Sequence, residues 1–305
     1  MPMGQTESPR NPVGQTSRRE FLQAAAGAAV VTPALARAGH SSSSPASRRI
    51  LACVGTYSSP QGPEGAKGRG HGIYVMEMNP ATGALSEREL VPNDANPAWL
   101  AFDASHAHLY SANEVATFGD GKSGSVSAYA VDRATGHLTL LNTVSSEGAG
   151  PAHMSIHPSG KYALVANYAG GTVAVLPINA SGELGAATDV LHNHGTVGPE
   201  HAASAPAGSF AISGHDKPHA HMIQSDAAGR FVVASDLGLD RIFIWKFDLE
   251  AGKLTPNDPD TVALPPGDGP RHFTFHPNGR WFYSLQEEGS TIVVFDYDAN
   301  QGRLT

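Results

Sequence analysis

A short turn phrase that returns five times constrains the fold of this 305-residue chain more than any other feature. In each copy an Asn or Asp is followed within four positions by Gly-x-Leu; the copies are Asn79–Leu85, Asp132–Leu138, Asn179–Leu184, Asp248–Leu254 and Asp298–Leu304. Asn and Asp tolerate left-handed backbone and Gly supplies positive φ, so each copy predicts a hairpin turn. Successive glycines of the phrase lie 53, 46, 70 and 50 residues apart, which indicates a repeat architecture.

A second phrase falls at the same place in each repeat. Its copies are Pro97–Phe102, Gly150–Tyr162, Pro218–Phe231 and Gly269–Trp281. Each is followed by a short apolar run and then by an alternating strand, such as Arg241–Phe247. Four short strands per unit, rich in β-branched and aromatic residues between turn signals, are typical of a β-propeller blade. The predicted fold class is therefore all-β, and the predicted architecture is a β-propeller.

The repeats predict about five blades over residues 49–305. The first copy, Ile50–Leu90, lacks its innermost strand, and the last reaches Thr305 where its outer strand should begin. We therefore expect blades 1 to 5 of a longer propeller.

A different kind of segment precedes the repeats. Arg18 and Arg19 are followed by Phe-Leu, by an apolar run from Ala24 to Ala36 and by small-x-small cleavage candidates. This pattern predicts a twin-arginine signal over residues 1–38, recognised by the twin-arginine export machinery, and a flexible leader over 39–48. The apolar run is shorter than the roughly 20 residues that span a bilayer, so we expect no membrane anchor after cleavage. The predicted location is periplasmic or secreted.

The net charge and the cysteine count narrow the range of binding partners and covalent links expected for the chain. The formal net charge of −8 disfavours nucleic acid and anionic membranes as ligands. Cys53 is the one cysteine, which excludes an internal disulfide. We expect a buried strand thiol there; a lipoprotein cysteine is the alternative, but Arg48 and Arg49 stand where its apolar stretch should be.

Comparing the repeats with one another identifies candidate site residues. In a propeller the innermost strands line a central channel, and the loops entering them open onto one face. The equivalent positions at these entries hold Trp99, His153, His221 and His272. Trp99, His153 and His272 are predicted to bind substrate, with a purely structural role for the three histidines as an equal alternative.

Three further residues stand out at the same face. His219 replaces a proline of the other repeats, Arg271 replaces an alanine, and Glu287 follows the second strand, 16 residues beyond Arg271. A charged or titratable side chain in place of a small or rigid one does little for folding. The Arg and Glu predict either a structural ion pair or an anion clamp with a carboxylate partner.

Six motifs in order carry a family resemblance: Val54–Tyr57, Gly72–Val75, Gly150–His153, Pro218–His221, Asp236–Arg241 and Gly269–His272. Together they resemble the seven-bladed lactonase family, which includes cycloisomerase-type 6-phosphogluconolactonases and fungal carboxymuconate lactonizing enzymes. The resemblance implies a seven-bladed propeller in the full family, acting on a lactone ring without a metal or organic cofactor.

The resemblance also implies the catalytic residues: His219 or His221, Arg271 and Glu287. By hypothesis, Arg271 binds the anionic group or the oxyanion, a histidine takes the proton from water, and Glu287 orients one of them or protonates the leaving ring oxygen. Gln286 stands where the family commonly has Asn, and Asp216-Lys217 precede Pro218 where Gly is usual.

The predicted function is hydrolysis of a sugar lactone or a similar small cyclic ester. Because 6-phosphogluconolactone is a cytoplasmic metabolite, the export signal favours an unphosphorylated substrate. Three alternatives stay open: a lactonizing cycloisomerase, a non-enzymatic propeller that binds a ligand or protein, and a metal site among the six histidines from His192 to His221. The spacing of those histidines matches no tight ligand pattern, so a long loop between blades is expected there. The glycine-rich run Gly62–Gly72 lacks a phosphate-loop ending and is expected to be a hairpin tip.

Overall fold

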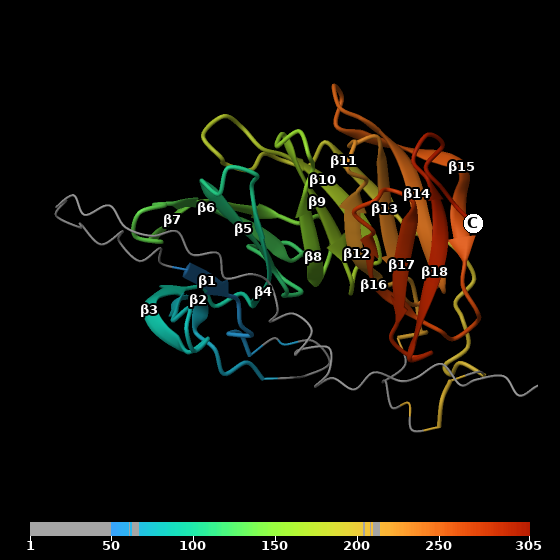
Figure 1. Cartoon of the computed structure of the whole chain (residues 1–305), viewed down its shortest axis with the longest axis horizontal. Helices are drawn as coiled ribbons and strands as arrows, with labels where there is room; N and C mark the ends of the chain where they lie inside the picture. The colour runs from blue at the N-terminus through green and yellow to red at the C-terminus, as the bar shows by residue number, and fades with distance from the viewer. Residues whose placement is uncertain (1–49, 61, 63–66, 204, 208, 210–213) are drawn as a thin grey trace, which may run out of the picture. The chain divides into compact units, whose positions relative to one another are not determined.

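The computed structural model describes residues 50–305, apart from 61, 63–66, 204, 208 and 210–213. The predicted export signal and leader lie outside the described residues. In the described part all named elements are β-strands, which form five separate antiparallel sheets (Figure 1). We number these sheets blades 1 to 5 in chain order. Among the same residues there is no helix of the length and apolarity that crossing a membrane requires.

Blade 1 has three strands and each later blade has four. Blade 1 contains β1 (Ile50–Val54), β2 (Gly72–Met78) and β3 (Leu85–Pro92). Blade 2 contains β4 (Pro97–Phe102), β5 (His108–Asn113), β6 (Ser125–Val131) and β7 (Leu138–Ser145). Blade 3 contains β8 (Pro151–Ile156), β9 (Tyr162–Asn167), β10 (Thr172–Pro177) and β11 (Asp189–His192).

Blade 4 contains β12 (Ala220–Ser225), β13 (Phe231–Asp236), β14 (Arg241–Asp248) and β15 (Lys253–Ala263). Blade 5 contains β16 (Pro270–Phe275), β17 (Trp281–Gln286), β18 (Thr291–Asp298) and β19 (Arg303–Leu304). In every sheet the strands pair in chain order. The predicted four-stranded repeat is found in blades 2 to 5, and the described residues of blade 1 form three strands. The outer strand of blade 5, expected to begin at Thr305, is already present as β19.

Each neighbouring pair of blades shares one hydrophobic core. Strand β9 shows how the sequence produces this, because its side chains alternate between two cores. Leu164 faces blade 4 and packs in a cluster with Ile223, whereas Val165 faces blade 2 and packs in a cluster with Tyr110. A strand buried on both faces reads as a continuous apolar run. The short apolar runs predicted after each entry phrase are these second strands.

The five turn phrases are hairpin turns between the third and fourth strands, as predicted. In each turn the Asn or Asp side chain accepts a hydrogen bond from the backbone N–H two residues on, at 2.8–2.9 Å. The five glycines have φ between 63° and 86°. Four of them, in blades 2 to 5, also lie against the second strand of the preceding blade, on Leu51, His108, Tyr162 and Phe231.

Gly252 illustrates a constraint that the turn pattern alone does not reveal. A Cβ there would lie 2.5 Å from the Tyr162 ring and 2.7 Å from Thr188 Oγ1, too close for any side chain. The Tyr162 hydroxyl donates to the carbonyl oxygen of Leu249 at 3.2 Å in the same turn. The glycine is therefore required by the contact between blades as well as by the backbone conformation.

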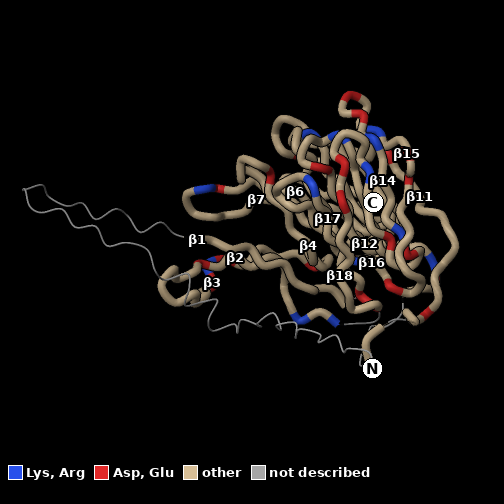
Figure 2. Tube along the Cα trace, turned by 45° about the vertical axis from the view of Figure 1, so that its right-hand side comes forward, with Lys and Arg blue, Asp and Glu red and all other residues tan. Residues whose placement is uncertain are grey.

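Three smaller predictions concern loops and the cysteine. No named strand lies among the described residues between His192 and Ala220, so the predicted long loop is confirmed; we call residues 193–219 the blade 3–4 loop. The glycine-rich run joins β1 to β2, as predicted. Cys53 lies in β1, partly buried, and burial raises the pKa of its thiol, as does the nearby Glu89 charge. Figure 2 shows basic and acidic residues dispersed along the described chain.

The shared cores predict a large difference between two leucines. Leu164 is fully buried between blades 3 and 4, whereas Leu140 on β7 is 55% exposed. Leu164→Ala should lower the free energy of unfolding by about 2–5 kcal/mol, because it leaves a cavity. Leu140→Ala should change it by less than about 0.5 kcal/mol. Urea denaturation followed by circular dichroism measures both, and equal effects would contradict this account of the core.

Candidate functional site

A β-bulge interrupts the start of the innermost strand in each of blades 2 to 5. The register with the second strand shifts between Pro97 and Trp99, between Pro151 and His153, between Ala220 and Met222, and between Pro270 and Phe273. A bulge twists the strand and redirects the adjacent side chains. The candidate residues Trp99, His153, His221, Arg271 and His272 all lie at these bulges, so the repeat supplies the same geometric device four times.

The four equivalent ring side chains meet. The centroid of Trp99 lies 4.2 Å from that of His153 and 5.4 Å from that of His272. His272 in turn lies 6.0 Å from His153 and 5.1 Å from His221. Four side chains that come from four blades therefore form one cluster, which we call the ring cluster.

Burial keeps the histidines of the ring cluster uncharged. Desolvation lowers the pKa of His153 to about 3, helped by the charge of His272. It lowers the pKa of His272 to about 4, with Arg271 as the second cause. The pKa of His221 is lowered well below 6.5, again by desolvation first and by Arg271 next. All three imidazoles are neutral at neutral pH, because the charged form loses hydration and faces a cation.

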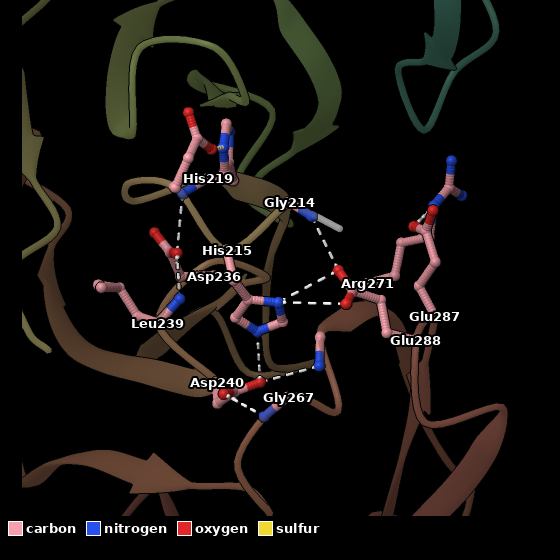
Figure 3. A network of polar contacts seen from close by, with 12 residues as sticks. Gly214, His215, His219, Asp236, Leu239, Asp240, Gly267, Arg271, Glu287 and Glu288 are labelled. Carbon is pink, nitrogen blue, oxygen red and sulfur yellow. Dashed lines mark hydrogen bonds and ion pairs between the residues drawn. The ribbon is translucent and has the colours of Figure 1, made fainter. Parts of the chain in front are cut away.

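Arg271 and Glu287 form an ion pair beside this cluster. Arg271 Nε lies 2.5 Å from Glu287 Oε2, and the two side chains are 39% and 34% exposed (Figure 3). The backbone holds both partners: Ser235 donates its hydroxyl to the carbonyl oxygen of Arg271 at 2.6 Å, and Glu287 N donates to the carbonyl oxygen of Gly269 at 2.8 Å. Two of the three residues that the repeat comparison singled out, Arg271 and Glu287, are thus in direct contact and partly exposed to solvent.

The two candidate basic histidines differ in what their rings contact. His219 stacks on Tyr168 with centroids 4.2 Å apart, and its Nδ1 donates to the carbonyl oxygen of Tyr168 at 3.0 Å. Its Nε2 lies 2.6 Å from Asp216 Oδ1. Both ring nitrogens of His219 are therefore engaged. In contrast, Nδ1 of His221 is buried and has no hydrogen-bond partner among the described residues.

Two buried carboxylates explain a motif that the sequence alone left without a role. Asp236 Oδ1 accepts hydrogen bonds from the backbone N–H groups of His219 and Leu239, at 2.8 and 3.1 Å, and Oδ2 accepts one from Asn193 at 2.8 Å. Asp240 contacts His215, which also contacts Glu288. In the sequence, Asp240 and Glu288 could have been identified only from their positions. Asp240 shares a motif with Asp236, and Glu288 follows Glu287.

The histidines from His192 to His221 do not gather at one point. His192 and His194 stack on each other at 6.4 Å, His215 lies between carboxylates, and His221 belongs to the ring cluster. Among the described residues, no group of three or more His, Cys, Asp or Glu side chains has an arrangement that would hold a metal ion.

Residues 51–305 match the family described as "Lactonase, 7-bladed beta-propeller". The chain belongs to this family. The resemblance and the fold class expected from the motifs are therefore confirmed.

Two solved structures and one curated relative show how the chain compares within the lactonase family. A 6-phosphogluconolactonase of Bacillus subtilis is 32% identical over 84% of this chain, and the chain spans 65% of that relative's length. A putative 6-phosphogluconolactonase from Bacteroides fragilis superposes with a TM-score of 0.69 at 30% identity, covering 86% of this chain and 67% of the other. The periplasmic gluconolactonase of Pseudomonas aeruginosa superposes with a TM-score of 0.69 at 30% identity, covering 84% of this chain and 66% of the other.

The buried histidines of this member of the lactonase family predict that stability falls at low pH. His153 has a pKa of about 3 in the folded chain against an ordinary value of 6.5. Between these values the unfolded chain binds a proton that the folded chain refuses, so stability falls as the pH drops through this range. His153→Asn should lose less stability than the unmutated protein between pH 6.5 and about pH 4. The Asn side chain can still accept the 3.4 Å hydrogen bond from Ile223 N.

Urea denaturation at several pH values measures this, with His194→Asn, at an exposed histidine of the blade 3–4 loop, as the matched control. A variant whose stability falls as steeply as that of the unmutated protein would contradict the burial of a neutral His153.

Proposed function

We propose that the chain carries the active site of a lactonase that hydrolyses an uncharged sugar lactone or a similar small cyclic ester. The observation that carries the proposal is the solvent-open Arg271–Glu287 pair beside a cluster of neutral histidines. The family match and the names of the relatives support the reaction class. Because the chain spans less than two thirds of its first two curated relatives, the reaction is proposed for the whole protein.

Arg271 is placed to stabilise negative charge on the substrate. Its Nε is held by Glu287, which fixes the plane of the guanidinium group. Among the described residues no hydrogen bond engages the two terminal nitrogens, and the side chain is 39% exposed, so we infer that their N–H groups are available to a ligand. When water attacks the ring carbonyl, the carbonyl oxygen becomes an oxyanion. Donors aimed at that oxygen typically lower the barrier more than any other single group in the site.

His221 is the better candidate for the general base. His219 donates Nδ1–H to a backbone carbonyl and directs Nε2 at a carboxylate, so both of its ring nitrogens are already engaged. His221 is neutral and has a ring nitrogen without a partner among the described residues. The Arg271 charge makes the resting imidazole a weak base. The oxyanion offsets the Arg271 charge as it forms. The basicity of His221 therefore rises in the step in which it takes the proton from water.

The full step then conserves atoms and charge. The water oxygen bonds to the carbonyl carbon, and its proton passes to His221. The bond between that carbon and the ring oxygen breaks, and the ring oxygen leaves as a hydroxyl after receiving a proton from His221. Glu287 orients Arg271 throughout. Trp99, His153 and His272 form the wall against which the sugar ring packs.

The charges of the site favour an unphosphorylated substrate. The three histidines are neutral, and the Glu287 carboxylate balances the Arg271 charge, so this part of the site has no net positive charge for a phosphate group. Lys217, on the same loop as His219, donates its ammonium group to the carbonyl oxygen of Ala169. A neutral lactone fits these charges better than a phosphorylated one.

Lactone hydrolysis followed by pH-stat tests the proposal. The mature full-length protein should hydrolyse glucono-1,5-lactone faster than 6-phosphogluconolactone, with or without a chelator. Arg271→Gln should lower kcat/KM by roughly 100-fold, the usual cost of losing an oxyanion donor. Arg280→Gln is the matched control, because Arg280 is an exposed arginine of the same blade. Full activity in Arg271→Gln would refute the assignment, and no hydrolysis of either lactone by folded protein would favour a binding propeller or a lactonizing reaction.

We also propose that residues 1–38 direct export to the periplasm or beyond by the twin-arginine machinery. The Arg18-Arg19 pair with the apolar run supports this, as does the periplasmic location named for one relative. Replacing both arginines with lysine should retain the protein, uncleaved, in the cytoplasm. Cell fractionation and mass spectrometry of the mature N-terminus measure the outcome, and unchanged export of the double-lysine variant would refute the route.

A further inference from the structure

His215 is a fully buried histidine held between two carboxylates. Its Nε2 lies 2.9 Å from Asp240 Oδ1, and its Nδ1 lies 3.2 Å from both oxygens of Glu288 (Figure 3). The side chains of His215, Asp240 and Glu288 are 0%, 6% and 4% exposed. The preceding residue, Gly214, donates its backbone N–H to Glu288 Oε1 at 2.8 Å. We call these three side chains the His215 tie.

The tie joins four segments that are distant in the sequence. His215 belongs to the blade 3–4 loop, Asp240 to the turn between β13 and β14, and Glu288 to the turn between β17 and β18. Asp240 also accepts the backbone N–H groups of Gly267 and Gly269 in the connection between β15 and β16, at 2.7 and 2.9 Å. One buried imidazole thus links the loop to both blades 4 and 5.

The hydrogen bonds fix the number of protons in the tie. A neutral imidazole has one N–H, yet both ring nitrogens face carboxylate oxygens, which only accept unless protonated. The tie therefore contains either an imidazolium with two carboxylates or a neutral ring with one protonated carboxyl group. The net charge is −1 in both cases. An uncharged residue at position 215 would leave two carboxylates buried beside each other, at a substantial cost.

A third acid makes the surroundings of the tie still more negative. Asp268 is buried in the same connection, and the backbone N–H of Glu288 donates to its carbonyl oxygen at 3.0 Å. Burial raises the pKa of the Asp268 carboxyl group, and the charge of Asp240 raises it further. Because these acids are buried near one another, they are stabilised by a cation or a proton donor at position 215.

Three of the four segments in the tie carry a residue of the proposed active site a few positions away. Glu288 is next to Glu287, Gly269 is two residues before Arg271, and His215 is six residues before His221. The backbone closes the arrangement, since Glu287 N donates to the carbonyl oxygen of Gly269. We propose that His215 is a positioning residue: it sets the placement of the Arg271–Glu287 pair relative to the strand that bears His221. The catalytic part of this inference rests on the proposed lactonase function.

Hydrogen exchange and kinetics on the full-length protein test the proposal together. In His215→Gln, exchange should increase in peptides covering residues 214–223, 264–272 and 284–290. In the same variant kcat should fall roughly 10- to 100-fold with little change in KM, because the reacting groups are misplaced while the substrate contacts remain. His194→Gln, in the same loop, is the matched control and should change neither.

A second variant removes the excess buried charge. Glu288→Gln added to His215→Gln leaves one carboxylate in place of two, so exchange protection and kcat should both recover in part. This double variant also keeps the test decisive if His215→Gln alone does not fold.

The outcomes distinguish failure of the His215 proposal from failure of the proposed lactonase function. Unchanged exchange in His215→Gln would overturn the tie, and increased exchange with unchanged kcat would overturn the positioning role. If the unmutated protein hydrolyses no lactone, the proposed function fails by itself. Exchange in the peptides containing Arg271 and Glu287 then decides the tie: lost protection supports it and retained protection overturns it.

Discussion

The packing of each sheet against the next is the constraint on which the rest of this molecule depends. Neighbouring blades share a core, and in blades 2 to 5 the turn glycine sits on the second strand of the blade before it. The contact leaves no room for a side chain, as at Gly252 against Tyr162. Because the contact recurs, it sets each innermost strand in a fixed relation to the next. Side chains from four blades can then converge at the ring cluster.

The β-bulges redirect side chains at the start of the innermost strands, so that these side chains converge in the candidate site. Without them, the entry residues would continue the alternation of the innermost strands. With them, Trp99, His153 and His272 come within 4.2–6.0 Å of one another. In blade 5 the bulge spans two residues, Arg271 and His272, against one on β17. The net excess is one residue in each of blades 2 to 5, but only in blade 5 does the unpaired stretch contain an arginine.

Much of the fold was predictable because short segments of the sequence determine its turns and strands. Turn glycines, entry phrases and alternating strands each follow from short-range backbone chemistry, and their order gave the blades. The Arg271–Glu287 contact was also predictable as one of two alternatives, since a two-strand hairpin brings its ends to one face. The engagement of His219 with Tyr168 and Asp216 was not, because it depends on how a loop folds back on a neighbouring blade. The same holds for His215, whose carboxylate partners lie 25 and 73 residues away.

Three kinds of histidine occur within a short stretch of this chain, and their environments assign them different work. His219 directs both nitrogens at acceptors and anchors the loop to blade 3. His215 does the same between two acids and joins the loop to blades 4 and 5. His221 has a buried nitrogen with no partner in the described part of the chain, and its pKa is lowered by burial first and by the Arg271 charge next, which keeps the ring neutral. Both ring nitrogens of His215 and of His219 are engaged by other groups of the protein, which supports the proposal that these two histidines position the loop while His221 acts as the base.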